Sequence, residues 1–180
     1  HEGNSNDITF TVAEQELKNA QNLCKKLITS LGGEITTQSN MSKLSISGAG
    51  IMGRPGIAAT LFETLSRAGI NLRLIATSEV KVSCVIDAES GKKASRSVGE
   101  FFKLNDKQIS INPTIKNNNE PEVRGIALDK DQIQISVKNV PDKPGTASII
   151  CSTLAEQNIS LDTIVQSERR HKDTTKEISF

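Results

Sequence analysis

The sequence predicts an α+β fold of tandem β-α-β-β-α-β units, each an antiparallel sheet with helices on one face. This order is the ferredoxin-like split pattern. Three observations support it: an internal repeat, the same succession of strand and helix patterns in each copy, and a core of small aliphatic residues with few aromatics. The 180 residues are enough for one medium domain or two small ones.

The internal repeat aligns residues 42–79 with residues 131–168, 89 positions further along the chain. Both copies carry a Pro-Gly dipeptide, at Pro55-Gly56 and Pro144-Gly145. Further identities pair Ala58, Thr64, Leu65, Ile70, Leu72, Ile75, Ser78 and Glu79 with Ala147, Thr153, Leu154, Ile159, Leu161, Ile164, Ser167 and Glu168. Because the matches follow the predicted core positions, we interpret them as a duplicated structural unit.

Each copy predicts a strand, a helix with one apolar face, and two further strands. The expected strands are 44–47, 71–77 and 81–87 in the first copy, and 133–137, 160–166 and 176–180 in the second. A proline precedes each helix, where its missing N–H costs nothing. The first copy continues into a second helix over residues 92–103.

The segments outside the repeat also show strand and helix patterns. Residues 7–12 predict a strand, residues 13–31 a helix with an apolar stripe, and residues 34–38 a short strand. Residues 105–122 are polar and Asn-rich, which indicates a linker, and residues 123–128 predict one more strand.

Composition excludes several functions. Lys plus Arg is 22 and Asp plus Glu is 21, so the formal charge is +1 and offers no basic surface for nucleic acid or an anionic membrane. The aromatics are five Phe with no Trp or Tyr, too few to stack single-stranded bases. No apolar run approaches the roughly 20 residues of a membrane span. We expect neither a nucleic acid nor a membrane as partner.

The cysteines Cys24, Cys84 and Cys151 are far apart and lie among apolar neighbours. An odd number without metal-ligand spacing predicts core thiols in a reducing compartment, so we expect a cytoplasmic protein without a bound metal. The chain starts at His1 without an initiator Met or a hydrophobic leader, and we interpret it as a piece of a longer protein.

Catalytic constellations are not evident. The two histidines, His1 and His171, lie in polar tails, and nothing supplies the partners of a Ser/His/Asp or Cys/His arrangement. The segment Gly48–Gly53 has Gly-x-Gly-x-x-Gly spacing, but no doubly wound β-α-β pattern follows it, so we do not expect a nucleotide there. We expect no catalytic residues in this chain.

The Pro-Gly turns suggest a ligand site. A helix start leaves its first backbone N–H groups unpaired beside a positive dipole end, which suits a carboxylate. An α-amino acid also needs acceptors for its ammonium group, and Asp142 and the amide oxygen of Gln166 are candidates. The alternative interpretation is a turn that only starts a helix well.

Specific motifs make this sequence resemble the regulatory region of aspartokinases, which is built from ACT units. The resemblance to the first effector-binding unit lies in residues 140–147 (Val-Pro-Asp-Lys-Pro-Gly-Thr-Ala) and residues 164–167 (Ile-Val-Gln-Ser). The resemblance to the second unit lies in residues 45–50, 54–58, 68–71 and 76–83. Residues 7–12 and 123–128 are similar to strands that the family places around the first unit.

The resemblance divides the chain into four parts. Residues 7–40 would be the back half of a first ACT unit, residues 41–104 a second unit, residues 105–122 a linker, and residues 123–180 a leading strand with the front half of another first unit. That order resembles the junction between two tandem ACT pairs in four-ACT aspartokinases of the cyanobacterial type. We also consider that residues 133–180 pack with residues 7–38 as one permuted unit, in which residues 7–12 and 176–180 compete for one strand position.

The resemblance implies allosteric sensing. ACT units would bind lysine or threonine and feed back on ATP-dependent phosphorylation of L-aspartate, a step of lysine, threonine and methionine biosynthesis. ATP and magnesium would bind the kinase domain, which this chain lacks, and ACT sheets would pair side by side in a homodimer. The implied effector-binding residues are Asp142, Pro144, Gly145, Thr146, Ala147 and Gln166 on the first-unit side, with Met52, Arg54, Pro55, Gly56, Ile57, Asn71 and Leu72 on the second-unit side. The alternatives are a stand-alone ACT amino-acid sensor and an ACT dimerisation module without ligand.

Overall fold

The computed structural model describes residues 8–51, 54–78, 80–111, 133–159, 161, 163–168 and 175–180. Its strands are β1 (Met41–Ser47), β2 (Leu74–Ser78), β3 (Lys81–Asp87), β4 (Ser136–Pro141), β5 (Val165–Glu168) and β6 (Thr175–Ser179). Its α-helices are α1 (Leu17–Leu31), α2 (Ile57–Arg67), α3 (Gly91–Phe101) and α4 (Thr146–Glu156). Short 3-10 helices cover Glu14–Glu16, Ala88–Ser90 and Asp106–Gln108.

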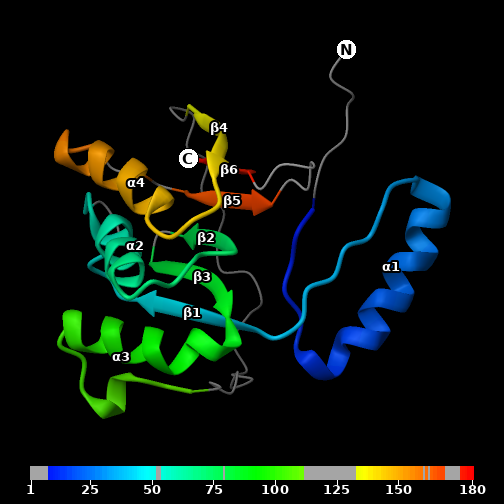
Figure 1. Cartoon of the computed structure of the whole chain (residues 1–180), viewed down its shortest axis with the longest axis horizontal. Coiled ribbons are helices and arrows are strands. Elements are labelled where there is room, and N and C mark those ends of the chain that lie inside the picture. Colours follow the sequence, from blue (N-terminus) through cyan, green and yellow to red (C-terminus); the bar gives the residue numbers. More distant parts are fainter. Residues whose placement is uncertain are drawn as a thin grey trace.

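The described strands form a single antiparallel sheet in the order β1-β3-β2-β5-β6-β4 (Figure 1). Each repeat contributes three strands in equivalent order, with its last strand in the middle. The two halves join where β2 pairs with β5, with Ile75 opposite Gln166 and Ala76 opposite Val165. The sequence predicted side-by-side pairing of ACT sheets between two chains of a homodimer. In this structure, two repeats of one chain pair in that way.

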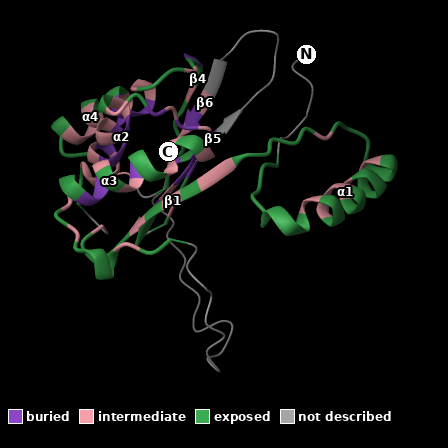
Figure 2. Ribbon diagram, turned by 60° about the horizontal axis from the view of Figure 1, so that its bottom comes forward, coloured by how far each residue is buried: buried purple, intermediate pink, exposed green. Residues whose placement is uncertain are grey.

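Helices α2, α3 and α4 lie on one side of this sheet (Figure 1), which confirms the predicted α+β class. Helices α2 and α4 pack against each other, and α3 packs against α2 and β1 (Figure 1). The buried apolar residues of both repeats form one cluster between helices and sheet (Figure 2). Its fully buried side chains include Leu61, Phe62, Leu65, Ile75, Ile86, Ile164 and Ile178.

Both helix starts use the Pro-Gly turn in the same way. Gly56 and Gly145 have φ angles of 95° and 97°, in the left-handed region that disfavours side chains. A Cβ on Gly145 would lie 2.9 Å from Oγ of Ser66, and a Cβ on Gly56 would lie 3.6 Å from Cβ of Ala155. Ser66 and Ala155 are equivalent positions of the repeat, so each helix start meets the end of the other helix.

The N-terminal region departs from the sequence predictions. Residues 8–12 and 34–38 form no strand, and helix α1 has no buried residue and stands apart from the sheet (Figures 1 and 2). The predicted strands at both ends of α1 are wrong for the described residues. The permuted unit is also not formed, because β6 already occupies the place between β5 and β4. Residues 8–12 therefore do not take the strand position that β6 holds.

Other boundaries shift by a few residues. The predicted strand at 133–137 is observed as β4, beginning at Ser136, and it carries an irregularity between Val137 and Val140. The strand predicted at 160–166 is β5, which begins at Val165. The predicted strand at 123–128 and the linker beyond residue 111 lie outside the described residues.

The cysteine prediction holds for two thiols. Cys84 and Cys151 are buried, whereas Cys24 on α1 is only partly covered. Burial raises the pKa of each buried thiol from its ordinary value of 9.0 to about 12. Within the described ranges, no helix has the length and apolar character needed to cross a bilayer.

Candidate functional site

A small cavity lies at the junction of the two repeats, between the turn that precedes α4 and the segment that precedes β2. We call it the Asp142 pocket. Its volume is about 10 Å³. It is lined by Phe62, Ile70, Asn71, Leu72, Val140, Pro141, Asp142, Lys143, Gly145, Thr146, Ala147, Ser148, Gln166 and Ile178. Each repeat supplies part of the wall, so the pocket exists only because the repeats are joined.

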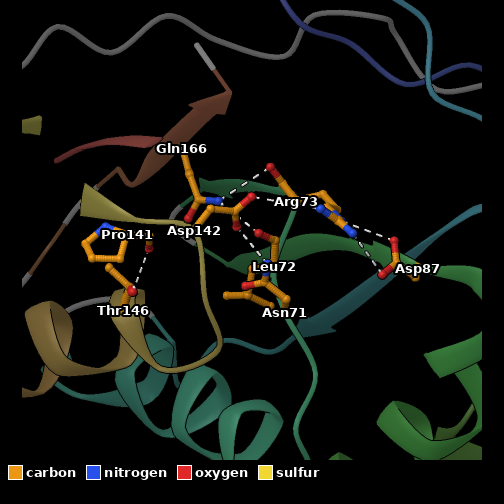
Figure 3. A network of polar contacts seen from close by, with 8 residues as sticks. All are labelled: Asn71, Leu72, Arg73, Asp87, Pro141, Asp142, Thr146 and Gln166. Carbon is orange, nitrogen blue, oxygen red and sulfur yellow. Dashed lines mark hydrogen bonds and ion pairs between the residues drawn. The ribbon is translucent and has the colours of Figure 1, made fainter. Parts of the chain in front are cut away.

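The carboxylate of Asp142 is the centre of the polar contacts in this pocket. Asn71 donates a hydrogen bond from Nδ2 to Oδ1 of Asp142 at 2.7 Å (Figure 3). Nη1 of Arg73 lies 3.9 Å from the other carboxylate oxygen. The Asp142 side chain is 18% exposed, so both contacts act where water screens them less than on an open surface.

Arg73 also forms a two-pronged contact on its other side. Its Nε and Nη2 each donate to one carboxylate oxygen of Asp87 at 3.1 Å (Figure 3). This bidentate geometry fixes the plane of the guanidinium group. Arg73 therefore lies between two carboxylates, Asp87 from its own repeat and Asp142 from the other.

Gln166 ties the two repeats together from the sheet side. Its side chain is buried, and Nε2 donates to the carbonyl oxygens of Leu72 at 3.1 Å and Arg73 at 3.4 Å. These carbonyls precede β2, at the end of the strand that pairs with β5. The Gln166 amide thus links β5 of the second repeat to the backbone just before β2 of the first repeat.

The turn before α4 supplies the remaining wall. Thr146 donates from Oγ1 to the carbonyl of Pro141 at 2.8 Å, which closes the turn onto the end of β4 (Figure 3). Ala147 and Ser148, in the first turn of α4, line the pocket and are buried. Their backbone N–H groups lie in the first turn, where an α-helix offers donors to an anion.

A second cavity, of about 60 Å³, occupies the equivalent place around the start of α2. Arg54, Pro55, Gly56 and Ile57 line it, together with Thr77, which stands at the position equivalent to Gln166. Oγ1 of Thr77 accepts a hydrogen bond from the backbone N–H of Ile164 at 2.6 Å. Among the described residues that line this second cavity, only Arg54 is charged.

The structure divides the predicted site residues between these two places. The Asp142 pocket brings together Asn71, Leu72, Asp142, Gly145, Thr146, Ala147 and Gln166. Arg54, Pro55, Gly56 and Ile57 lie at the second cavity instead, so they do not share a wall with Asn71 and Leu72. Pro144 is exposed and does not line the Asp142 pocket, and Met52 lies outside the described residues.

Sequence reasoning missed Arg73 and Asp87. A signal for this pair was available, because residues 71–77 and 81–87 were predicted as neighbouring strands. Antiparallel pairing places Leu74 opposite Val85, which brings Arg73 close to the end of β3. Opposite charges at such cross-strand positions attract each other.

The chemistry of the Asp142 pocket suits a small zwitterion. Asp142 lines it together with the first residues of α4, and its other lining residues, apart from Lys143, are neutral or apolar. A volume of about 10 Å³ holds at most about one water molecule. Anything larger than a water molecule would have to widen the pocket, and the Asn71–Asp142 hydrogen bond links the two repeats there. The described residues contain no group of His, Cys, Asp and Glu suited to a metal ion.

Comparison with known proteins points to one family. Residues 44–102 match the ACT domain family. The chain is 36% identical over 102 residues to an aspartokinase of Pseudomonas aeruginosa, a match that covers 56% of this chain and 25% of the relative. It is 32% identical over 104 residues to an aspartokinase of Thermus thermophilus, covering 58% of this chain and 26% of the relative. The chain thus spans about a quarter of the length of these relatives.

A solved structure extends the likeness to the whole chain. The crystal structure of aspartate kinase from Synechocystis superposes with a TM-score of 0.88 and 40% sequence identity. This match covers 100% of the present chain and 32% of that protein. The predicted relation to the ACT region of aspartokinases is confirmed.

Proposed function

Since residues 44–102 belong to the ACT domain family, we propose that this chain is an amino-acid-sensing regulatory part of an aspartokinase. It binds an end-product amino acid, threonine or lysine, in the Asp142 pocket. The observation that carries this proposal is the meeting of Asp142, Asn71 and Gln166 at one helix start, although the residues come from different repeats.

Each end of an amino acid finds a complementary group in this arrangement. The ligand carboxylate takes the N–H groups of the first turn of α4, where the helix dipole favours negative charge. The ligand ammonium takes the carboxylate of Asp142, which lines the pocket from the turn that precedes α4. The side chain faces the apolar wall that includes Phe62 and Ile178.

Regulation follows from the closed state of the pocket. A ligand that inserts at Asp142 replaces the 2.7 Å bond from Asn71 and separates the turn before α4 from the segment before β2. Because these elements belong to different repeats, ligand binding shifts the equilibrium between two arrangements of the repeats. A coupling free energy of about 1–3 kcal/mol is enough for feedback inhibition.

The rest of the enzyme supplies the chemistry under this proposal. A kinase domain of the same polypeptide binds ATP and magnesium and phosphorylates L-aspartate. The present chain transmits the bound state of its effector to that domain in the cytoplasm. Homodimers form through further ACT contacts.

A second candidate function is assembly without a ligand. The small volume of the Asp142 pocket and its direct Asn71–Asp142 bond favour this alternative, since the site is already satisfied by the protein itself. In that case the joined repeats serve to hold subunits together.

Calorimetric titration separates the two functions. The chain is titrated with L-threonine, L-lysine and, as a control ligand, L-aspartate. Regulation predicts saturable binding of threonine or lysine that is lost in Asp142→Ala and Gln166→Ala. The matched control Asp106→Ala, at an exposed acid outside the pocket, keeps wild-type affinity. A folded chain that binds neither amino acid at millimolar concentration contradicts the sensing function and leaves assembly, which sedimentation analysis then measures.

A further inference from the structure

The position of Arg73 bears on which amino acid the Asp142 pocket accepts. Arg73 does not line the pocket, but its Nη1 lies 3.9 Å from the carboxylate oxygen of Asp142, behind the group that would receive the ligand ammonium. An arginine stays protonated at every pH a folded protein meets. The charge behind Asp142 is therefore permanent.

The pocket has few acidic side chains. Among the described residues that line it, the charged side chains are Asp142 and Lys143. Asp87 lies on the far side of Arg73, where both of its oxygens are engaged by the guanidinium at 3.1 Å. Asp142 thus already faces one cation, and the α-ammonium of any amino acid adds a second.

Together with Arg73, Lys143 and the α-ammonium, a cationic side chain on the ligand would be a fourth positive charge near Asp142. The other polar lining residues, such as Thr146, Ser148 and Gln166, are neutral. An ammonium group without a carboxylate partner is costly in a half-buried site, whereas a hydroxyl group is satisfied by neutral hydrogen-bonding partners. The pocket is therefore matched to a zwitterion whose side chain is uncharged.

We propose that Arg73 is a specificity-determining residue that makes the Asp142 pocket select amino acids with uncharged side chains, threonine rather than lysine. This inference rests on the proposed amino-acid binding in the same pocket. Arg73 acts through Asp142, by keeping part of its negative charge engaged, and through repulsion of a second ammonium group. Asp87 tempers this effect, because its two contacts draw the guanidinium away from Asp142.

The test compares ligands that differ in charge. L-lysine and L-norleucine have side chains of similar length, and only lysine carries the terminal ammonium. Calorimetry on the whole 180-residue chain measures the affinity for L-threonine, L-lysine and L-norleucine in each variant. For the unsubstituted chain we expect threonine and norleucine to bind more tightly than lysine.

Four variants separate charge from structure. Arg73→Gln is expected to raise the affinity for lysine relative to norleucine about tenfold, since the repulsion of two nearby unit charges at an intermediate dielectric is of this order. Arg73→Lys keeps the charge and the original ratio. Asp87→Asn releases Arg73 toward Asp142 and shifts the ratio in the opposite direction, against lysine. The matched control Arg67→Gln removes an arginine from the exposed face of α2 and leaves the ratio unchanged.

The outcomes are distinguishable. An unchanged ratio of lysine to norleucine affinity in Arg73→Gln overturns the inference but leaves amino-acid binding intact. Tighter binding of lysine than of threonine and norleucine by the unsubstituted chain also overturns it. Binding of none of these ligands by the folded chain contradicts the proposed function itself. If Arg73→Gln does not fold, Arg73→Lys and Asp87→Asn decide the matter by the same ratio.

Discussion

The two repeats of this chain share their strand and helix order, yet they cover their apolar residues to different extents. In the first repeat, Leu61 and Leu65 of α2 are completely buried. The equivalent residues of α4, Ile150 and Leu154, are only partly buried. Just before edge strand β4, Ile135 is 53% exposed, whereas the equivalent Ile46, on edge strand β1, is partly buried against the core.

The difference comes from helix α3. This helix packs against α2 and β1 and adds Ala94 and Val98, both buried, to the shared core. No described helix takes the corresponding place beside α4 and β4. The same sequence pattern is therefore a fully buried face in one repeat and a half-buried face in the other, according to whether a third element covers it.

The largest expected effect tests this difference directly. Leu61→Ala is expected to lower the free energy of unfolding by about 3–4 kcal/mol, because it opens a cavity in a closed core. Ile150→Ala, at the equivalent position, is expected to cost about 1–2 kcal/mol, since its surroundings are partly solvated. Urea unfolding of both variants measures the two values. Equal losses would show that α3 does not distinguish the repeats.

A smaller effect concerns what the repeats share. Each contributes one buried thiol, Cys84 on β3 and Cys151 on α4, with a pKa of about 12. Unfolded thiols ionise near pH 9, so between pH 9 and 12 the unfolded chain has lost protons that the folded chain keeps. Stability is thus complete below pH 9 and falls above it, by up to about 1.4 kcal/mol per pH unit for each thiol.

Urea unfolding at a series of pH values from 8 to about 10.5 measures this decline. If both thiols lie in one cooperative core, Cys84→Ala and Cys151→Ala should each make the decline less steep by a similar amount. A change in slope for one variant alone would mean that the two repeats unfold separately.

The smallest effect lies on the exposed helix faces. In α2, Nη2 of Arg67 lies 2.6 Å from a carboxylate oxygen of Glu63, and both side chains are well exposed. The equivalent residues of α4 are Ser152 and Glu156, which cannot form this pair. Arg67→Ala is expected to cost only about 0.3–0.5 kcal/mol, and less at high salt. Thermal unfolding compares it with Glu156→Ala, and a loss above 1 kcal/mol for Arg67→Ala would contradict this view.

The two repeats also differ in the side chains that line their equivalent cavities. Asp142 and Gln166 stand at one cavity, whereas Arg54 and Thr77 stand at the other. Both lie at a left-handed glycine before a helix, so the backbone is alike and the side chains differ. Under the proposed function, a few side chains on a duplicated backbone frame would decide ligand preference.

The sequence by itself determined the local units. Alternation and helical periodicity, with the Pro-Gly turns, specified β3, α2 and α4, because these signals depend on neighbouring residues. The motif around Asp142 and Gln166 also indicated half of the pocket. In these cases the covalent order and the local conformation carry the information.

Only the tertiary structure decided how the units meet. The joining of β2 to β5 places Asn71 against Asp142, 71 positions away in the chain. The same joining brings Arg73 behind that carboxylate and leaves α1 apart from the sheet. Which strand edges pair depends on which remain open after every unit has folded, and this choice is made between distant residues by burial and ladder hydrogen bonds.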